Sequence, residues 1–411
     1  MPLGGSIIMS LPPAVVVGLN DTGLSIVRSL GRRGVRIVGL YDDPRDYCLK
    51  SRYLARKIRQ SPLYGESLIE TLIQDVSHTL RERAVLFCAS DRSVLTACGH
   101  KDSLSPHFYF VLPSYEVAST QISKKSFQDF AVRNSFLIPK AFFTSKAEQI
   151  HEVSEQISFP CVVKPEFRDR DWNDKVPEKV LYIESKQNFL RLIEEYNIQD
   201  SPLIIQEWID GNDSHVYFCL AYISAEHGPV AHVTGRKLSQ HPHLTGSTAI
   251  AETVWLPDLA NESLRLLREA KCVGLCSVEF KCSNKDGLFY LTEPTVGRAD
   301  TQEGLAIASG VDLPYIAYLD ATGRTAVPAQ RFTLGVKWIN EPLAFYSSQM
   351  YIKGGIRDLG RLLELFRGNR SYSLCAVDDV MPALDFLRDK ALAGLRKLAK
   401  LPVLAVKNHL R

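Results

Sequence analysis

The segment SVEFKCSNKDGLFYLTEPTVGR, residues 277–298, decides how the rest of the chain is interpreted. Strand-forming residues flank the turn-forming run NKDG at residues 284–287, and this pattern predicts a β-hairpin. With a three-residue loop at 285–287 and its glycine in the left-handed conformation, Glu279 lies directly opposite Glu293. Like charges at directly opposed positions destabilise a sheet unless something neutralises them. The hairpin therefore predicts a cation beside the two glutamates.

The ligand chemistry favours a hard cation. Oxygen ligands on short side chains suit Mg²⁺ or Mn²⁺, above all an ion shared with nucleotide phosphates. The alternative is that both glutamates lie on the solvent face of an ordinary hairpin. Upstream, Lys164 lies near the end of the apolar segment 158–165, directly before Pro165. A lysine at that position must reach solvent or meet an anion such as phosphate.

A second apolar strand, residues 203–209, carries Glu207 and is followed by Asp210 and Asp213. A strand whose backbone pairs with a base edge, followed by carboxylates within reach of a ribose, suits a purine nucleotide. Between the two strands, residues 166–179 are dense in charge, and we expect a mobile loop there.

Length and composition restrict the class of protein. A chain of 411 residues predicts two or three domains, and a net charge of +3 with 23% charged residues argues against nucleic-acid binding. The nine cysteines form no CxxC pair, which favours reduced thiols in the cytoplasm over a zinc site or disulfides. We expect no secretory signal and no transmembrane segment.

The N-terminal part predicts a βαβ unit, with strands at 14–17 and 35–40 around a helix at 24–33. Further buried strands at 85–89 and 109–112 indicate a parallel sheet. Asn20 stands where the dinucleotide fingerprint has its second glycine, so a Rossmann-like structural or substrate-holding domain is favoured over NAD binding.

Helical spacing predicts one helix over 119–134 that carries Lys124 and Lys125, and residues 311–314 are interpreted as a loop. The C-terminal segment 381–410 combines helical Leu and Ala spacing with several Lys and Arg residues. It predicts either a solvated helical face or a basic amphipathic helix on an anionic membrane surface.

In this order the motifs resemble the ATP-grasp superfamily, and within it the carboxylate-amine ligase branch that includes D-aspartate ligase-like proteins. The resemblance covers about residues 14–311. It is carried by the segments CVVKP (161–165), IQEWIDGND (205–213), SVEF (277–280) and LTEPTVGR (291–298).

The resemblance implies an α/β and α+β multidomain protein. Residues 1–118 would form a Rossmann-like domain that precedes the ATP-grasp domain. Residues 119–330 would form the ATP-grasp domain, with a small lid subdomain at about 140–210 and a large subdomain at about 211–330. Residues 331–411 would form a partly helical C-terminal extension.

The resemblance also implies an ATP-dependent, ADP-forming ligase with Mg²⁺ or Mn²⁺, small-molecule carboxylate and amine substrates, and a possible homodimer. The implied nucleotide-binding residues are Lys124 or Lys125, Lys164, Lys179, Gln206, Glu207, Trp208, Ile209 and Asp213. The implied metal ligands are Glu279, Glu293 and Thr295. The residues implied to hold the acyl phosphate or substrate carboxylate are Arg236, Lys237 and Arg298.

Two departures from the family pattern keep other functions open. Thr295 stands where the family usually has Asn, and the usual glycine-rich phosphate flap is replaced by residues 167–179. An ATP-binding protein without ligase activity is therefore an alternative, and an NAD-dependent oxidoreductase is a further one.

Overall fold

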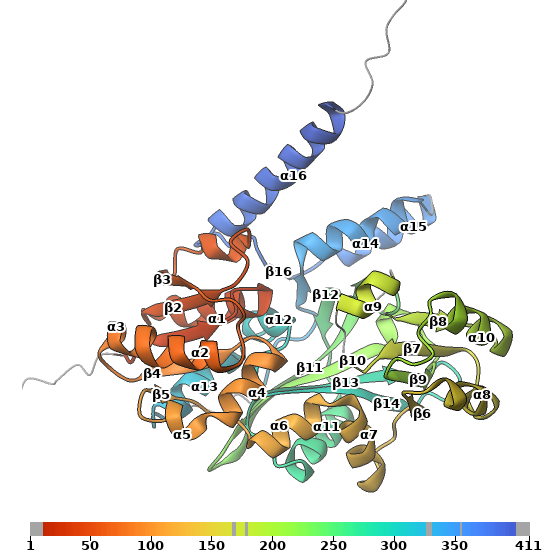
Figure 1. Cartoon of the computed structure of the whole chain (residues 1–411). Helices are drawn as coiled ribbons and strands as arrows, with labels where there is room; N and C mark the ends of the chain where they lie inside the picture. Colours follow the sequence, from red (N-terminus) through yellow and green to blue (C-terminus); the bar gives the residue numbers. More distant parts are fainter. Residues whose placement is uncertain (1–10, 167–169, 177–179, 326–330, 354–355, 400–411) are drawn as a thin grey trace, which may run out of the picture.

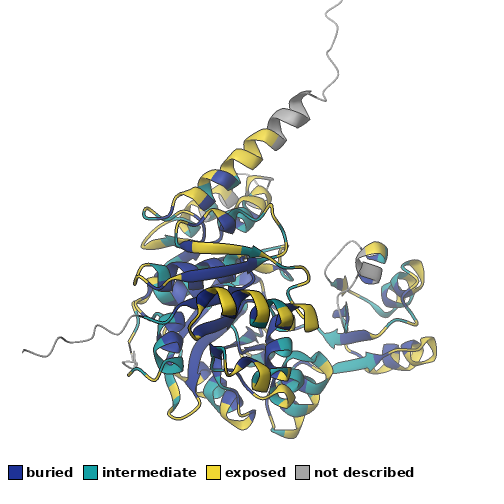
Figure 2. Ribbon diagram, turned by 60° about the vertical axis from the view of Figure 1, so that its left-hand side comes forward, coloured by how far each residue is buried: buried dark blue, intermediate teal, exposed yellow. Residues whose placement is uncertain are grey.

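The computed structural model describes residues 11–166, 170–176, 180–325, 331–353 and 356–399 (Figure 1). Three β-sheets organise these residues, one parallel, one antiparallel and one mixed. Figure 2 shows that buried residues fill the centre of the molecule, while the C-terminal helix stands out from its surface. This architecture confirms the predicted multidomain α/β and α+β class.

The first sheet is parallel and Rossmann-like. Its strands follow the order β3 (Leu54–Arg59), β2 (Ile37–Tyr41), β1 (Ala14–Val17), β4 (Ala84–Cys88) and β5 (Phe108–Tyr109). Its helical segments are α1 (Asp21–Gly31), η1 (Tyr47–Lys50), α2 (Glu66–Glu70), η2 (Thr71–Ser77), α3 (His78–Leu80), α4 (Asp91–Gly99) and α5 (Lys101–Leu104).

The residues near the start of α1 have local structural roles. The side chain of Asn20 caps α1 by accepting the N–H of Gly23 at 2.9 Å. A Cβ added to Gly23 would lie 2.0 Å from the carbonyl oxygen of Gly18, so the strand and helix approach too closely for any side chain there. This packing explains why residue 23 is a glycine without any bound dinucleotide.

The two other sheets belong to the middle of the chain. The smaller one is antiparallel, with the order β6 (Ala141–Thr144), β9 (Leu203–Glu207), β7 (Cys161–Pro165) and β8 (Leu181–Ile183). The larger one has the order β14 (Phe289–Val296), β13 (Gly274–Cys282), β10 (Val216–Ser224), β11 (Gly228–His241), β12 (Ser247–Thr253), β15 (Lys337–Ile339) and β16 (Arg370–Tyr372).

The remaining helices flank these sheets (Figure 1). They are α6 (Tyr115–Ile122), α7 (Lys124–Arg133), α8 (Ala147–Gln156), α9 (Arg170–Lys175), α10 (Lys186–Glu195), η3 (Asp213–His215), α11 (Pro257–Glu269), α12 (Glu303–Ala308), α13 (Leu313–Ala321), α14 (Glu341–Lys353), α15 (Ile356–Leu365) and α16 (Met381–Ala399). No helix within the described residues is long and apolar enough to cross a bilayer.

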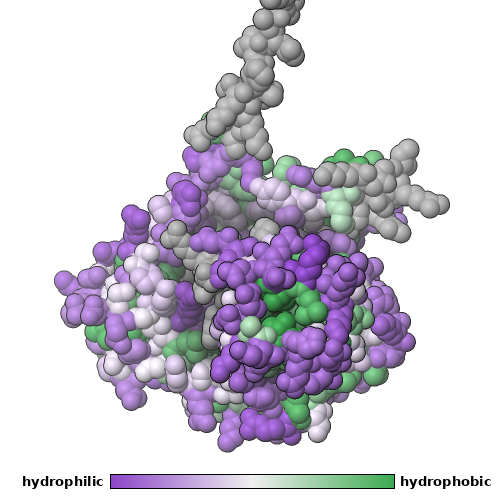
Figure 3. Space-filling view, turned by 45° about the vertical axis from the view of Figure 1, so that its right-hand side comes forward, coloured by the Kyte–Doolittle hydropathy of each residue, from purple (hydrophilic) through white to green (hydrophobic). Residues whose placement is uncertain are grey.

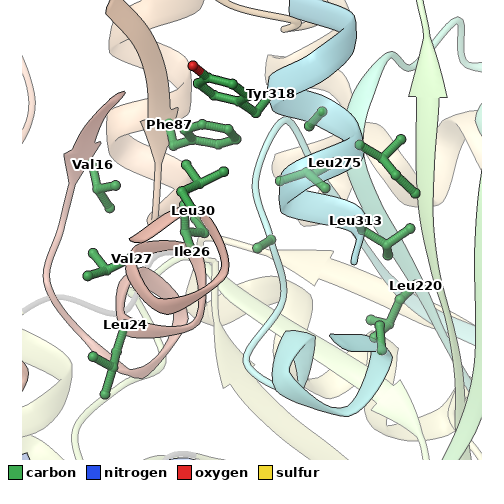
Figure 4. Close-up of a cluster of buried hydrophobic side chains, with 14 of the residues drawn as sticks. Val16, Leu24, Ile26, Val27, Leu30, Phe87, Leu220, Leu275, Leu313 and Tyr318 are labelled. Atoms are coloured by element: carbon green, nitrogen blue, oxygen red, sulfur yellow. The ribbon is translucent and has the colours of Figure 1, made fainter. Parts of the chain in front are cut away.

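One hydrophobic core joins the first sheet to the large sheet. Figure 4 shows Leu30 of α1, Phe87 of β4 and Tyr318 of α13 packed together, with Leu220 of β10 in the same cluster. Because this core crosses the predicted boundary at residue 118, the division into domains stays a prediction.

The C-terminal extension is anchored by a buried cation. Arg28 of α1 contacts Asp379 at 2.9 Å and donates to the carbonyl oxygens of Ser373 and Leu374 at 2.6 and 2.7 Å. Both charged side chains are at most 6% exposed. A guanidinium with this many acceptors fixes the extension to the first sheet.

Three sequence predictions were wrong in detail. The helix predicted over 119–134 is two helices, because Ser123 is extended and caps α7 by accepting from Ser126. The loop predicted at 166–179 contains α9, whose Trp172 is 3% exposed and packs in the core of the small sheet. The loop predicted at 311–314 opens α13, which places apolar residues against the first sheet.

Candidate active site

The hairpin formed by β13 and β14 has the predicted pairing of Glu279 with Glu293. The turn is one residue longer than predicted, because Ser283 bonds Leu288 across residues 284–287, and Gly287 has the expected positive φ of 72°. A bulge in the middle of the ladder restores the register, since the pairing shifts between Glu279 and Phe280.

The bulge leaves Thr292 unpaired in the ladder and turns it toward Glu279. Its hydroxyl donates to the backbone carbonyl oxygen of Glu279 at 3.0 Å. Both glutamates then line one cleft, together with Thr292 and Thr295. The side chain of Glu279 is 28% exposed, and Glu293 is exposed.

The cleft lies between the small sheet and the large sheet and has a volume of ≈ 420 Å³. Most of the residues predicted from the sequence for nucleotide, metal and substrate binding line it: Lys124, Lys164, Gln206, Glu207, Trp208, Ile209, Lys237, Glu279, Glu293, Thr295 and Arg298. They come from α7, β7, β9, β11, β13 and β14 and from the residues that follow β9 and β14, so the fold gathers residues up to 174 positions apart.

Two predicted phosphate-binding lysines lie at the small-sheet side of this cleft. Lys124, the first residue of α7, donates to the carbonyl oxygen of Glu166 at 3.1 Å, and Lys164 donates to Gln206 at 2.8 Å. Of the two adjacent lysines, Lys124 lines the cleft, whereas Lys125 is exposed outside it. Lys179 lies outside the described residues.

Trp208 and Ile209, which directly follow β9, form an apolar wall of the cleft. Trp208 stands edge-on to Tyr182, with ring centroids 5.2 Å apart, and its backbone N–H bonds the carbonyl oxygen of Pro160 at 3.1 Å. The ammonium of Lys281 lies 5.5 Å from the centre of the Trp208 indole ring. An aromatic wall with a cation beside it suits a flat, electron-rich ligand next to anionic groups.

Arg236 and Lys237 lie on opposite faces of β11, as successive strand residues must. Lys237 enters the cleft and contacts Glu279 at 2.6 Å. Arg236 instead pairs with Glu252 at 2.6 Å in a separate cavity of ≈ 550 Å³ beneath α14 and α15. The two residues that were predicted to hold one substrate group therefore line two different cavities.

Arg298 links the cleft to the first sheet. Its guanidinium contacts Asp91, the first residue of α4, at 2.6 Å and also donates to the carbonyl oxygen of Ala299 at 3.1 Å. Asp91 lines a third cavity, of ≈ 440 Å³, at the carboxyl ends of β1, β2 and β4. The arginine thus stands where the two cavities approach each other.

Asp213, which the resemblance implies to be a nucleotide contact, does not line the cleft. It is 3% exposed and accepts four hydrogen bonds, from the backbone N–H groups of Gln240 and Leu244 and from the side chains of Gln240 and His243, at 2.8 to 3.0 Å. Both oxygens are occupied, so Asp213 anchors the segment whose continuation, residues 244–248, walls the cleft.

The sequence reasoning missed Lys281, which is 6% exposed and lines the cleft. Burial lowers the pKa of its ammonium from 10.5 to about 8, although Asp213 and Glu279 partly oppose this shift. Its position two residues after Glu279, on the same strand face, was the signal available. The sequence reasoning also missed Asp300, which accepts a short hydrogen bond from Ser277 and lines the cleft.

The donor set fits a hard divalent ion. Glu279 and Glu293 offer carboxylates on one face, and Thr295, 8% exposed, offers a hydroxyl. No group of three His, Cys, Asp or Glu side chains with metal-binding geometry occurs among the described residues. An ion on two carboxylates would therefore complete its shell with water and phosphate oxygens, which is the habit of Mg²⁺.

Known structures share this fold. The chain is similar to N5-carboxyaminoimidazole ribonucleotide synthetase (purK) in its ADP complex, with a TM-score of 0.62, 13% identity, and coverage of 95% of this chain and 98% of that chain. It is similar to biotin carboxylase from Campylobacter jejuni, with a TM-score of 0.62, 15% identity, and coverage of 81% and 75%. The protein therefore has the ATP-grasp fold, as predicted.

The sequence itself is similar to D-aspartate ligase from Enterococcus faecium (strain Aus0004). The two are 22% identical over 249 residues, which cover 57% of this chain and 58% of that protein. The chain thus matches less than two thirds of the length of this relative. No family model matches the chain.

Proposed function

We propose that the protein is an ATP-dependent carboxylate-amine ligase that releases ADP. The observation that carries this proposal is the pairing of Glu279 with Glu293 in one cleft with Lys124 and Lys164. Two carboxylates opposite several ammonium groups suit the triphosphate of a nucleotide and its metal ion. The similarity to D-aspartate ligase supports the same reaction class.

The chemistry needs positioning more than a protein nucleophile. A carboxylate resists attack by an amine because its oxygen is a poor leaving group. Transfer of the γ-phosphoryl group from ATP to the carboxylate gives an acyl phosphate and ADP. The amine then attacks the carbonyl carbon, the C–N bond forms, inorganic phosphate leaves with the bond electrons, and the amine loses a proton.

Different residues of the cleft have different parts in this reaction. Lys124 and Lys164 neutralise phosphate oxygens, and the segment from Gln206 to Ile209 holds the base and ribose. Bound Mg²⁺ would be held by Glu279 and Glu293, and it would neutralise phosphate charge during transfer. Thr295 supplies a hydroxyl on the same face.

Lys237 and Arg298 also line the cleft and are the cations we assign to the substrate. Lys237 balances the charge of Glu279 at 2.6 Å and is the cation we assign to the transferring phosphoryl group. Arg298, held by Asp91, is assigned to the substrate carboxylate, since a guanidinium binds carboxylates with two parallel bonds. An amino acid with a second carboxylate, such as aspartate, is the first donor to test.

A second candidate is an ATP-binding protein that does not ligate. The Lys237 ammonium already neutralises Glu279, and Thr295 offers a weaker ligand than an amide oxygen, so nucleotide binding without turnover is compatible with this cleft. ADP release that depends on both a carboxylate and an amine distinguishes the ligase from such a protein.

The test measures ADP release over mixtures of carboxylic acids and amines. The wild type should release ADP only when both substrate classes are present. Glu279→Gln and Glu293→Gln should each lower the rate by about two orders of magnitude or more, because both remove metal-binding charge. Glu226→Gln, at an exposed loop position, is the matched control and should retain the wild-type rate. Equal rates in all variants would refute the assignment.

We also propose a cytoplasmic protein that acts on small molecules and can form a homodimer. The nine cysteines support a reducing compartment, because none is paired and seven of them are buried. Cross-linking and light scattering of the purified chain test the dimer.

A further inference from the structure

The C-terminal extension covers the cavity of ≈ 550 Å³ that Arg236 lines. This cavity lies between the large sheet and the helices α14 and α15 (Figure 1), on the opposite face of β11 from the cleft. Cavities of this volume hold small organic molecules. We call it the extension cavity, and the lining residues that matter here are Arg236, Leu238, Glu252, Lys337, Met350, Glu364 and Leu365.

Three charged side chains form a row on the sheet side of the extension cavity. Arg236 of β11 is paired directly with Glu252 of β12, and Glu252 is paired in turn with Lys337 of β15. Directly opposed residues of neighbouring strands lie on the same face, with their Cβ atoms about 5 Å apart. The row therefore carries a positive, a negative and a positive charge in sequence across three strands.

The contacts within this row leave binding capacity for a ligand. Arg236 donates to Oε1 of Glu252 from Nε and Nη2 at 2.7 and 2.6 Å, so the second oxygen, Oε2, takes part in neither bond. The ammonium of Lys337 donates to the carbonyl oxygen of Glu364 at 2.7 Å, which uses one of its three N–H groups. The row can thus offer both an acceptor oxygen and ammonium protons.

The charges of the extension cavity balance. Asp213 and His243 bond each other at 3.0 Å, and Asp213 accepts three further hydrogen bonds from Gln240 and Leu244. Glu364 of α15 adds a second carboxylate to the row of three. Apart from the satisfied Asp213, the cavity therefore has two cations and two carboxylates.

This balance selects the charge of the ligand. A molecule with a single charge of either sign would meet like charges as well as opposite ones. A zwitterion can place its carboxylate beside Arg236 and Lys337 and its ammonium beside Glu252, which lies between them. The side chain of Glu252 is only 14% exposed, so these contacts are partly shielded from water.

Apolar side chains also line the extension cavity. Leu238 and Leu365 pack against a small cluster that includes Ile250 of β12, and Met350 of α14 is 43% exposed. Figure 3 shows hydrophobic and hydrophilic side chains next to one another at the upper end of the molecule, where Figure 1 places α14 and α15. The ligand should therefore have an apolar part beside its two charges.

We infer that the extension cavity binds a free amino acid with an apolar side chain. Its carboxylate pairs with Arg236 and Lys337, its ammonium pairs with Glu252, and its side chain packs against Leu238 and Leu365. This inference goes beyond the proposed ligase activity and does not rest on it, because none of these residues has a part in the proposed reaction.

The experiment is calorimetric titration of the full-length protein with leucine, methionine and phenylalanine. We expect at least one of them to bind. For leucine, the matched analogues are 4-methylpentanoate, which lacks the ammonium, and 3-methylbutylamine, which lacks the carboxylate. Each should bind about tenfold or more weakly, because each loses one set of charged hydrogen bonds. Glycine should also bind about tenfold or more weakly, because it has no apolar side chain to bury.

Two variants locate the binding. Arg236→Gln with Glu252→Gln removes both partners of the ion pair, so neither charge is left unpaired, and it should weaken amino-acid binding by about tenfold or more. Lys337→Gln should do the same. The matched control is Arg36→Gln with Glu82→Gln, an exposed pair at 2.7 Å beside the first sheet, which should bind like the wild type. An unchanged thermal unfolding midpoint shows that each variant is folded.

Three results would overturn the inference. They are absence of binding by all three amino acids, equal binding of leucine and 4-methylpentanoate, and amino-acid binding that is lost in Glu279→Gln but kept in both extension-cavity variants. The last result would place the amino acid in the cleft. Failure to release ADP would leave the binding result standing, and failure to bind an apolar amino acid would leave the ligase test standing.

Discussion

Replacing the buried Lys281 by Met should stabilise the protein while it weakens nucleotide binding. Lys281 is 6% exposed, and burial lowers the pKa of its ammonium from 10.5 to about 8. Each pKa unit corresponds to about 1.4 kcal/mol, so keeping this side chain charged at pH 7 costs about 3 kcal/mol. Methionine keeps most of the volume and removes the charge, but it also removes the bond to the carbonyl oxygen of Asn212 at 2.8 Å.

We therefore expect the free energy of unfolding of Lys281→Met at pH 7 to exceed that of the wild type by about 1–3 kcal/mol. The unfolded chain holds this proton up to a pKa of 10.5, and the folded chain only up to about 8. Between these values the unfolded state binds more protons, so the contribution of Lys281 to wild-type stability improves as the pH rises. The advantage of the variant should accordingly shrink from pH 8 toward pH 10.5.

The assay is urea unfolding followed by tryptophan fluorescence across that pH range. Lys285→Met is the matched control, because Lys285 is exposed in the turn of the same hairpin, and its stability should stay within about 0.5 kcal/mol of the wild type. A Lys281→Met variant that is less stable than the wild type at pH 7, or a stability difference that does not change with pH, would refute the reasoning.

Three further changes probe other contacts. Lys237→Met removes the ion pair with Glu279 and should lower the free energy of unfolding by about 2–3 kcal/mol, measured by thermal unfolding without metal. Mg²⁺ and ATP should recover most of this loss, and no recovery would contradict the proposed metal site. Arg28→Met leaves Asp379 buried and unpaired and should cost about 3–5 kcal/mol in urea unfolding, and a neutral result would contradict the anchoring role. Asp213→Ala leaves four donors unsatisfied, so we expect a loss of about 2–4 kcal/mol and a higher KM for ATP; an unchanged KM would separate Asp213 from the cleft wall.

The hairpin was predictable from the sequence because its information is local. The turn residues, the strand residues and the pairing of Glu279 with Glu293 all follow from a segment of 22 residues. The compensation between a longer turn and a bulge at Thr292 was not predictable, since a bulge depends on the contacts that its extra residue finds. The predicted three-residue loop and the observed longer turn with its bulge both place Glu279 opposite Glu293.

The assignment of neighbouring residues to one site was less predictable. Arg236 and Lys237 are adjacent and chemically alike, and only the pairing of β11 with its neighbours determines which of them faces the cleft. The surroundings of Asp213 were hard to predict for a similar reason, because the backbone donors that bind its carboxylate come from a segment that folds back onto it. Lys281 was missed because one lysine in a strand is an ordinary feature until its burial is known.

The central claim is that Glu279 and Glu293 together hold the metal ion of a metal–nucleotide complex. Calorimetric titration of ATP into the wild type, Glu279→Gln and Glu293→Gln, with and without Mg²⁺, tests it most directly. We predict that Mg²⁺ strengthens ATP binding to the wild type and that this gain is lost in both variants. An equal gain from Mg²⁺ in all three proteins would contradict the account.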